Sequence, residues 1–309
     1  MLYFIINPHS RSGQGGAVWK EVERTMISSG LPYKVSYTSY PGHAIRLAAE
    51  IPSGTQPEPN LIAVLGGDGS LNEVLNGAHL SPYTIIGYLP TGSGNDFARG
   101  MHLPIDAKKA LTHIIHPSYT DTLDFGSTTY GNQENARRFL VSSGIGYDAA
   151  VCHRINTSKL KKVFNCFHLG KLAYVILGIE QIIRCRRADG TLTIDDEREI
   201  PLSDVCFISC HNLPYEGGGF CFAPDADPHD GEMDLCVVTA CSRLRFTWIL
   251  LNTLLGAKHT RCHGVSLIRC HKAAVKLNRP LAVHTDGEVT GFFKEASFES
   301  HPHSVRITW

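Results

Sequence analysis

The fold of this chain is decided by residues 61–75, which read LIAVLGGDGSLNEVL. The apolar run at 61–65 predicts a buried β-strand, and Leu71, Val74 and Leu75 recur at the spacing of one helix face. The glycines between them allow the sharp backbone turn that joins a strand to a helix. Strand, glycine-rich turn and helix are typical of the units from which parallel sheets are built.

The same alternation continues on both sides of this stretch. Apolar runs at 2–6 and 84–89 predict further strands, and apolar residues at helical spacing predict helices over 17–26, 44–51 and 107–114. Strands that alternate with helices indicate a parallel sheet with crossover helices. We therefore expect an α/β domain over about the first 120 residues.

From about residue 121 the pattern changes. Short strand-like runs separated by turns replace the alternation, and long helical patterns interrupt them at 159–185 and 242–257. This spacing predicts an antiparallel sandwich. At about 150 residues per domain, a chain of 309 residues has room for both domains.

Composition excludes several classes of protein. Basic and acidic side chains number 29 each, and this zero net charge argues against a nucleic-acid-binding protein. The longest apolar run, 246–255, is broken by Asn252 and Thr253 and is shorter than the ~20 residues of a membrane span. The start lacks signal-peptide features, and the 10 scattered cysteines lack the spacing of a disulfide framework or a zinc site. We expect a cytoplasmic protein.

Two further polar loops follow predicted strands. Residues 90–99, PTGSGNDFAR, follow the strand at 84–89, and residues 7–16, NPHSRSGQGG, follow the strand at 2–6. Because neighbouring parallel strands end at one edge of the sheet, these loops and 66–70 are expected to face one crevice. Glycine amides at a helix start bind phosphate. The glycine turn matches neither of the two commonest nucleotide motifs, GxxxxGK[ST] and GxGxxG.

In order and spacing, the motifs of this chain resemble the diacylglycerol kinase catalytic-domain family, in particular its soluble bacterial lipid kinases. NAD kinases and phosphofructokinases share the GGDG loop and the architecture, but the loop at 94–98 resembles that of the lipid kinases. Ser70 and Ser93 stand where many members carry threonine, which keeps the hydroxyl. The motifs cover nearly the whole chain and comprise the Asn7-Pro8 loop, Gly66 to Gly69 with Asn72-Glu73, Pro90 to Arg99, Gly217 to Gly219, Ala223-Pro224 through Asp230-Gly231, and Asp286 to Glu288.

The resemblance implies a nucleotide-binding α/β domain of the NAD-kinase and phosphofructokinase type, a β-sandwich domain for the lipid, and an active site in the cleft between them. We place the first domain at 1–125, with 292–309 returning to it, and the second at 126–291. ATP is implied as the phosphate donor and Mg²⁺ as the cofactor. The expected nucleotide contacts are Asn7, Ser10, Arg11, Thr38, Gly66, Gly67, Asp68, Gly69, Ser70, Asn72, Glu73, Thr91, Gly92, Ser93 and Asn95.

The resemblance also implies two metal sites. Asp68 would hold Mg²⁺ directly or through water, with Asp96 and Asp124 in the supporting network. Asp230 and the carbonyl of Met233 would hold a second, structural Mg²⁺. Alternatively, Asp124 is only a turn residue, and the loop that contains Asp230 is an acidic turn that binds no metal.

Asp286 corresponds to the proposed general base of the family. A carboxyl group of ordinary pKa ~3.9 is a weak base toward an alcohol, so its expected role is to orient the hydroxyl and take the proton late. The alternative is a purely structural Asp-Gly hairpin turn.

A basic segment at 159–187 places lysines and arginines beside Leu160, Val163, Phe164 and Phe167. It suits peripheral contact with an anionic membrane surface, and a solvated helix face is the alternative. A homodimer is compatible with the resemblance, and the sequence neither requires nor excludes it.

We therefore predict an ATP- and Mg²⁺-dependent lipid kinase, with diacylglycerol converted to phosphatidic acid as the leading reaction. The alternatives are a kinase of a sphingoid base, ceramide or another lipid, a nicotinamide-nucleotide kinase, and a catalytically silent nucleotide- or lipid-binding regulator. The loop at 94–98 disfavours the nicotinamide kinase, and Asp68, Asn95 and Asp286 together disfavour the silent regulator. Which lipid is the acceptor depends on the residues that line the acceptor pocket, and the sequence does not reveal these residues.

Overall fold

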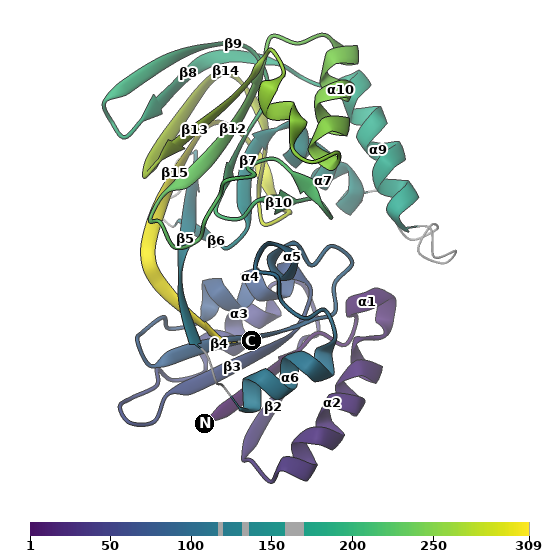
Figure 1. The fold of residues 1–309 in the computed structure, drawn as a ribbon, viewed down its shortest axis with the longest axis vertical. Coiled ribbons are helices and arrows are strands. Elements are labelled where there is room, and N and C mark those ends of the chain that lie inside the picture. Colours follow the sequence, from purple (N-terminus) through teal and green to yellow (C-terminus); the bar gives the residue numbers. More distant parts are fainter. Residues whose placement is uncertain (117–119, 132–135, 158–169, 309) are drawn as a thin grey trace. The chain divides into compact units, whose positions relative to one another are not determined.

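The computed structural model describes residues 1–116, 120–131, 136–157 and 170–308. The chain divides into two compact units (Figure 1). The first comprises Met1–Phe125, Pro228–Asp230 and His301–Trp309, and the second comprises Gly126–Asp227 and Gly231–Ser300. Within the described residues, no helix has the length and apolar character of a membrane span.

A parallel sheet forms the centre of the first unit. Its strand order is β2, β1, β3, β4 and the end of β15. β3 and β4 are paired from Asn60↔Thr84 to Gly66↔Pro90, so the loops that follow them begin side by side. The strands are β1 (Leu2–Ile6), β2 (Tyr33–Tyr37), β3 (Asn60–Gly66), β4 (Thr84–Pro90) and β15 (Glu288–Thr308).

Helices cover this sheet in two pairs. α2 and α6 pack against each other, and Trp19, Val22 and Met26 of α2 join Phe4 and Ile114 in one apolar cluster. α3 and α4 pack against each other and contact β1 and β3, respectively. The helices are α1 (Ser10–Gly13), α2 (Gly15–Ser29), α3 (His43–Ala49), α4 (Asp68–Gly77), α5 (Asp96–Gly100) and α6 (Ala107–Ile115).

Antiparallel strands form the second unit, in the order β13, β12, β9, β7, β14 and β15. β8 pairs with β9 and β14, and β5 pairs with β6 and β15. The strands are β5 (Thr120–Tyr130), β6 (Arg137–Phe139), β7 (Ser142–Gly146), β8 (Ala188–Ile194), β9 (Arg198–His211), β10 (Tyr215–Glu216), β11 (Phe220–Cys221), β12 (Met233–Thr239), β13 (Val265–Cys270) and β14 (Lys272–Thr285).

The helices of the second unit are α7 (Tyr147–Thr157), α9 (Gly170–Arg184), α10 (Arg243–Leu254) and the 3-10 helix Lys258–Arg261. α10 begins where the Ser242 side chain accepts a hydrogen bond from the N–H of Arg245 (3.3 Å). It ends just before Gly256, whose φ of +84° favours glycine. The helix predicted over 242–257 is therefore confirmed in type, and its ends are set by these two caps.

The α/β and antiparallel halves agree with the predicted fold class, with differences in detail. β15 pairs with β14 as far as Glu299 and joins β4 only from Arg306. Residues 292–300, assigned above to the first domain, therefore belong to the second unit. β14 is one continuous strand, although its pairing with β15 shifts register between Lys276 and Leu281.

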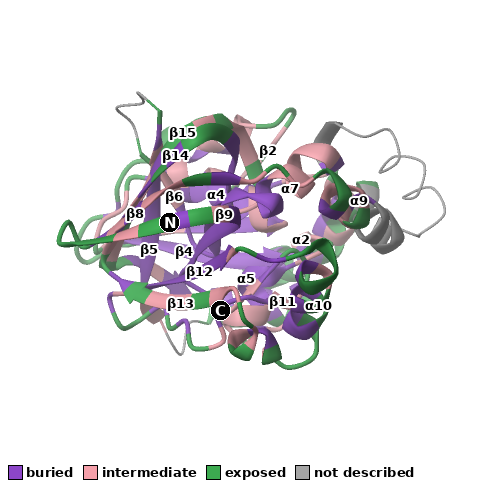
Figure 2. Cartoon of the chain, turned by 90° about the horizontal axis from the view of Figure 1, so that it is seen from above, coloured by how far each residue is buried: buried purple, intermediate pink, exposed green. Residues whose placement is uncertain are grey.

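Buried residues follow the strands of both units, as Figure 2 shows. In β3, Ile62 to Leu65 are fully enclosed, because helices cover both faces of this sheet.

Candidate functional site

Hydrogen bonds join three strand-end loops of the first unit. The Nδ2 of Asn7, after β1, donates to the Oγ of Ser70 on α4 (3.0 Å). The Oγ of Ser10 lies 2.8 Å from the Oγ1 of Thr91, after β4. The N–H of Thr91 donates to the carbonyl of Gly66 (2.8 Å). The loops after β1, β3 and β4 thus meet at the carboxyl edge of the sheet.

Two glycines let the backbones of these loops approach each other. A Cβ added at Gly67 would lie 3.1 Å from the Cα of Gly92, and a Cβ added at Gly92 would lie 2.8 Å from the Cα of Gly67. At Gly66 an added Cβ would lie 2.4 Å from the Cβ of Ser70. In the described part of the chain, no side chain caps the start of α4. An uncapped helix start beside a backbone cradle fits an anionic phosphate.

Asp68 connects the β3 loop to the β4 loop. Its Oδ2 accepts a hydrogen bond from the N–H of Asp96 (3.1 Å), and its Oδ1 accepts one from the N–H of Phe97 (3.2 Å). Asp96 forms an ion pair with Arg99. Burial and the nearby charges of Asp68 and Asp96 raise the pKa of Tyr88 well above its ordinary value. An ionised carboxylate has about four acceptor positions, so Asp68 fits the role of a Mg²⁺ ligand while it holds α5.

Asn95 adopts a left-handed conformation with a φ of 50°. Its Oδ1 accepts a hydrogen bond from the N–H of Gly92 (2.8 Å), which closes the β4 loop. Ser93, in the loop after β4, and Arg11, after β1, are both exposed to solvent. Thr38, after β2, donates its N–H to the carbonyl of Ile6 (2.9 Å) and so lies beside the end of β1.

Glu73 and Asn72 have partners within the protein. The two carboxylate oxygens of Glu73 accept hydrogen bonds from the N–H groups of Gly42 (2.7 Å) and Ala44 (3.0 Å), at the start of α3. Asn72 is fully buried, and its Oδ1 accepts a hydrogen bond from the Nδ2 of Asn76 (3.2 Å). Glu73 therefore joins α4 to the start of α3, and the Asn72–Asn76 bond lies within α4; the motif alone did not indicate either role.

The structure does not bring Asp124 together with Asp68 and Asp96 as one set of ligands. Asp124 is fully buried, its N–H donates to the carbonyl of Pro228 (2.8 Å), and its Oδ1 accepts from the N–H of His303 (2.7 Å). Among the described residues, the group of three or more ligand-type side chains within 4.8 Å of one another lies elsewhere, in the second unit.

The two residues predicted for a second metal site lie in different units. Asp230 is exposed and belongs to the first unit. Met233 begins β12 in the second unit, where its side chain is buried and its Sδ lies 3.4 Å from the Sγ of Cys210. Their joint role stays a prediction.

Asp286 occupies the turn between β14 and β15, with a φ of 47°. Its Oδ1 accepts hydrogen bonds from the N–H groups of Val141 (2.9 Å) and Ser142 (3.0 Å), and its Oδ2 accepts one from the N–H of Leu140 (3.0 Å). Three N–H donors favour the charged form of a carboxylate. Asp286 therefore fastens the chain between β6 and β7 to the β14–β15 turn.

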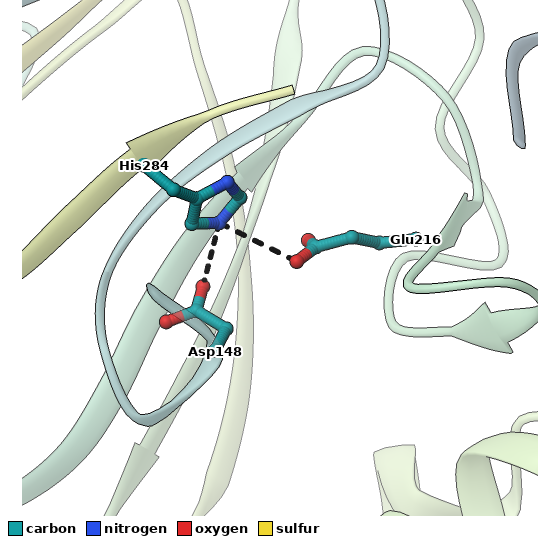
Figure 3. A group of neighbouring side chains, drawn as sticks. All are labelled: Asp148, Glu216 and His284. Carbon is teal, nitrogen blue, oxygen red and sulfur yellow. Dashed lines mark hydrogen bonds and ion pairs between the residues drawn. The ribbon is translucent and has the colours of Figure 1, made fainter. Parts of the chain in front are cut away.

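His284, two residues before Asp286, belongs to a buried ionic cluster with Asp148 and Glu216 (Figure 3). The Nε2 of His284, on β14, is 3.1 Å from an oxygen of Asp148 on α7 and 3.4 Å from an oxygen of Glu216 on β10. Burial disfavours a charged imidazole, but Glu216 and Asp148 outweigh it and raise the pKa of His284 to about 9. Nothing in the local sequence relates the three members of this cluster, so the sequence does not predict it.

The His284 cluster is also tied to the Asp286 turn. The N–H of Gly287 lies 3.2 Å from the Nδ1 of His284, so the imidazole also contacts the turn that contains Asp286. A Cβ added at Gly144 would lie 2.0 Å from the Oδ2 of Asp148, so the backbone of β7 packs directly on the cluster. The three side chains have the types and the spacing of metal ligands, with one atom of each within 4.8 Å of the others. The Nε2 of His284, however, already contacts both carboxylates, so the group forms an ionic network among its own members.

A hollow of about 470 Å³ lies in the second unit beside α7 and α9. Its lining combines apolar and basic side chains, so it suits a molecule with an apolar chain and a polar head. The apolar members include Tyr147, Leu281, Ala282 and Phe292, and the basic ones are His153, Arg186, and the Glu180-paired Arg154 and Arg184.

The chain matches two family models that together span it almost completely. Residues 1–127 match the diacylglycerol kinase catalytic domain. Residues 141–309 match the YegS C-terminal NAD kinase beta-sandwich-like domain.

The chain is similar to bacterial proteins with related names. It is 29% identical over 291 residues to YtlR of Bacillus subtilis (strain 168), a protein named as a lipid kinase, and the match covers 94% of this chain and 93% of the relative. It is 30% identical over 240 residues to the diacylglycerol kinase of the same strain, covering 76% of this chain and 73% of the relative.

A crystal structure from Bacillus anthracis strain Sterne, described as a diacylglycerol kinase, shares the fold. The TM-score is 0.76 at 20% identity, and the match covers 99% of this chain and 96% of that one. The family models, the relatives and the joined glycine loops lead to one conclusion: the chain belongs to the diacylglycerol kinase catalytic-domain family of lipid kinases.

Proposed function

We propose that this protein transfers the γ-phosphoryl group of ATP, with Mg²⁺, to the hydroxyl of a lipid alcohol, and that the reaction converts diacylglycerol to phosphatidic acid. Nucleotide binding is supported by the meeting of three strand-end loops beside the uncapped start of α4. Two of these loops come into backbone contact at Gly67 and Gly92. Family membership supports a lipid acceptor, and the names of the relatives support diacylglycerol.

The first unit would bind the nucleotide through groups of three kinds. Backbone amides near Gly67 and the positive end of α4 would attract the phosphates. The hydroxyls of Ser10 and Thr91, which already contact each other, would orient them. Asp68 is the residue proposed to hold Mg²⁺, which when bound neutralises phosphate charge during transfer.

The second unit would bind the acceptor. The hollow beside α7 has the apolar and basic lining that suits a lipid with a polar head. Asp286 is proposed to orient the acceptor hydroxyl and to take its proton late. The three N–H bonds to its carboxylate support this role in two ways, because they fix its position and favour its anionic form.

We further propose a cytoplasmic protein that associates peripherally with anionic membranes. In the basic segment predicted to do this, residues 158–169 lie outside the described part of the chain. Arg184 forms an ion pair with Glu180, and Arg187 forms one with Asp204, so neither is a free charge for lipid headgroups. A homodimer stays a prediction.

Transfer of labelled phosphate from ATP tests the proposed function, with diacylglycerol, sphingosine, ceramide and NAD as separate acceptors in mixed micelles. We expect labelled phosphatidic acid, and a loss of at least ~100-fold in Asp68→Asn, because a charge that stabilises the transferring phosphoryl group is removed. Asp196→Asn, which alters an exposed aspartate, is the matched control. Labelling of NAD alone, or ATP binding without labelling of any acceptor, would refute the proposal.

A further inference from the structure

α10 carries apolar residues on two opposite faces. Phe246, Ile249 and Leu250 are buried in the apolar cluster of the second unit. On the other side, four residues at spacings of four, three and four share one helix face. They are between 47% and 86% exposed, and we name them the α10 apolar face: Leu244, Trp248, Leu251 and Leu255.

The α10 apolar face exposes large apolar side chains on successive turns of α10, and Leu255 extends it to the residue that caps the helix. Single exposed hydrophobic residues are normal, whereas a contiguous patch marks a site of interaction with a protein or a membrane. Figure 2 shows α10 with a buried and an exposed side. α9, which contacts α10, adds two exposed isoleucines one helical turn apart, Ile179 and Ile183.

The segment of chain that carries this face is basic, although the whole chain is neutral. Residues 235–285 contain eight lysines and arginines and no aspartate or glutamate. Arg243 and Arg245 are exposed at the start of α10, and Lys258 and Arg261 are exposed on the 3-10 helix that packs against it. Within the described parts of the chain, none of these four cations forms a salt bridge with a carboxylate.

We propose that the α10 apolar face docks on an anionic phospholipid bilayer, with α10 parallel to the membrane plane. This deepens the proposed function, because it names the surface on which a lipid kinase meets its substrate. The leucines and Trp248 would enter the boundary between headgroups and acyl chains, where an amphipathic helix with a tryptophan partitions well. The four cations would contact headgroup phosphates at both ends of the helix.

Charge complementarity favours a bilayer over a second copy of this chain. In a two-fold symmetric pair of α10 faces, the basic ends of one helix would meet the basic ends of the other. Arg243 and Arg245 would then face like charges with no nearby acidic residue of this segment to offset them. An anionic lipid surface neutralises the same charges.

The first test is cosedimentation with vesicles of phosphatidylglycerol and phosphatidylcholine, without diacylglycerol or ATP. We expect Trp248→Ser with Leu251→Ser to lower the partition coefficient at least ~10-fold, since each loses an apolar side chain from the membrane. Changing the four cations to glutamine should lower binding to a similar extent and remove its salt dependence. Ile27→Ser, at an exposed apolar residue of α2, is the matched control and should bind like the wild type.

A second readout places Trp248 itself in the lipid. Its fluorescence should shift to shorter wavelength on vesicle binding and be quenched by brominated acyl chains, and both effects should be lost in Trp248→Phe. The melting temperatures of all variants should stay near that of the wild type, because the changed side chains are exposed. Equal partitioning of wild type and variants would overturn the proposal. So would a dimer that Trp248→Ser with Leu251→Ser dissociates, without any vesicle binding.

These outcomes are separable from failure of the proposed kinase activity. Vesicles without acceptor lipid report docking alone, and a short-chain diacylglycerol dissolved as a monomer reports phosphoryl transfer alone. We expect the docking variants to keep the wild-type kcat on the dissolved substrate and to show a raised KM on vesicles. Vesicle binding without phosphorylation of any lipid would refute the proposed function and leave docking intact. Phosphorylation with unaltered vesicle binding by the variants would refute docking alone.

Discussion

Replacing Asp286 by asparagine should destabilise the second unit as well as reduce activity. The side chain accepts three backbone hydrogen bonds, from Leu140, Val141 and Ser142. Asparagine keeps one carbonyl oxygen, which can preserve the two bonds made by Oδ1. Its amide group then faces the N–H of Leu140, so one donor meets another donor and loses its acceptor.

The magnitude follows from these bonds. A hydrogen bond to a charged group contributes about 1.5–3 kcal/mol, and the two preserved bonds weaken when the charge is removed. Asparagine tolerates the left-handed backbone at this position (φ 47°), so conformational strain adds little. We expect the free energy of unfolding to fall by about 2–3 kcal/mol, which lowers the melting temperature by about 5–10 °C in a unit of this size.

Differential scanning calorimetry of wild type and Asp286→Asn measures this loss. The control is Asp196→Asn, a second aspartate in the left-handed region (φ 56°) whose side chain is exposed and paired with Lys272 (2.7 Å). That exposed pair should contribute at most about 1 kcal/mol. If Asp286→Asn melts within about 1 °C of the control, the three N–H bonds do not hold the turn and the reasoning is wrong. Activity should be compared well below both melting temperatures, because an unfolded variant says nothing about proton transfer.

Three further predictions concern the strand-end loops of the first unit, α3 and His284. Gly92→Ala places a Cβ 2.8 Å from the Cα of Gly67, so the ATP affinity measured by calorimetry should fall at least ~10-fold. In the control Gly16→Ala, the nearest atom to the added Cβ is 3.9 Å away, and this variant should bind ATP normally. Glu73→Gln removes one of two acceptors at the start of α3 and should lower the free energy of unfolding by about 1–2 kcal/mol in urea, and an unchanged midpoint would contradict this. The pKa of His284 is raised to about 9, so its stabilisation is complete below about pH 6.5, the ordinary value, and is lost as pH rises through about 9. The melting temperature should therefore fall over this window, and a fall of equal size in His284→Gln would show that another group is responsible.

The three strand-end loops of the first unit could be predicted from the sequence because their signal is local. The run at 61–65, the glycines after it and the helical spacing of Leu71 and Val74 are all contained in fifteen consecutive residues. Parallel strands end at a common edge, so the meeting of the loops after β1, β3 and β4 followed from topology alone. The hydrogen bonds from Asn7 to Ser70 and between Ser10 and Thr91 are its consequence.

The roles of several motif residues could not be predicted in this way. A glutamate that follows GGDG is expected to belong to a phosphate-binding loop. Glu73 instead accepts the N–H groups at the start of α3, about thirty residues earlier in the chain. An Asp-Gly pair reads as a turn, and Asp286 is also an acceptor for N–H groups on a distant segment. Such partners are separated by long stretches of chain, and local sequence does not specify which backbone amides a carboxylate will meet.

The α/β pattern of the first unit, the change to antiparallel strands after about residue 121, and the family all follow from the sequence alone. These depend on the spacing of apolar residues and on short glycine motifs, which are properties of neighbouring residues. The buried network of Asp148, Glu216 and His284 appears only in the folded structure, as does the division of α10 into a side that buries Phe246 and a side that exposes Trp248. The physical reason is that burial and ion pairing depend on which distant elements pack together, and both apolar faces of α10 look the same until one of them is covered.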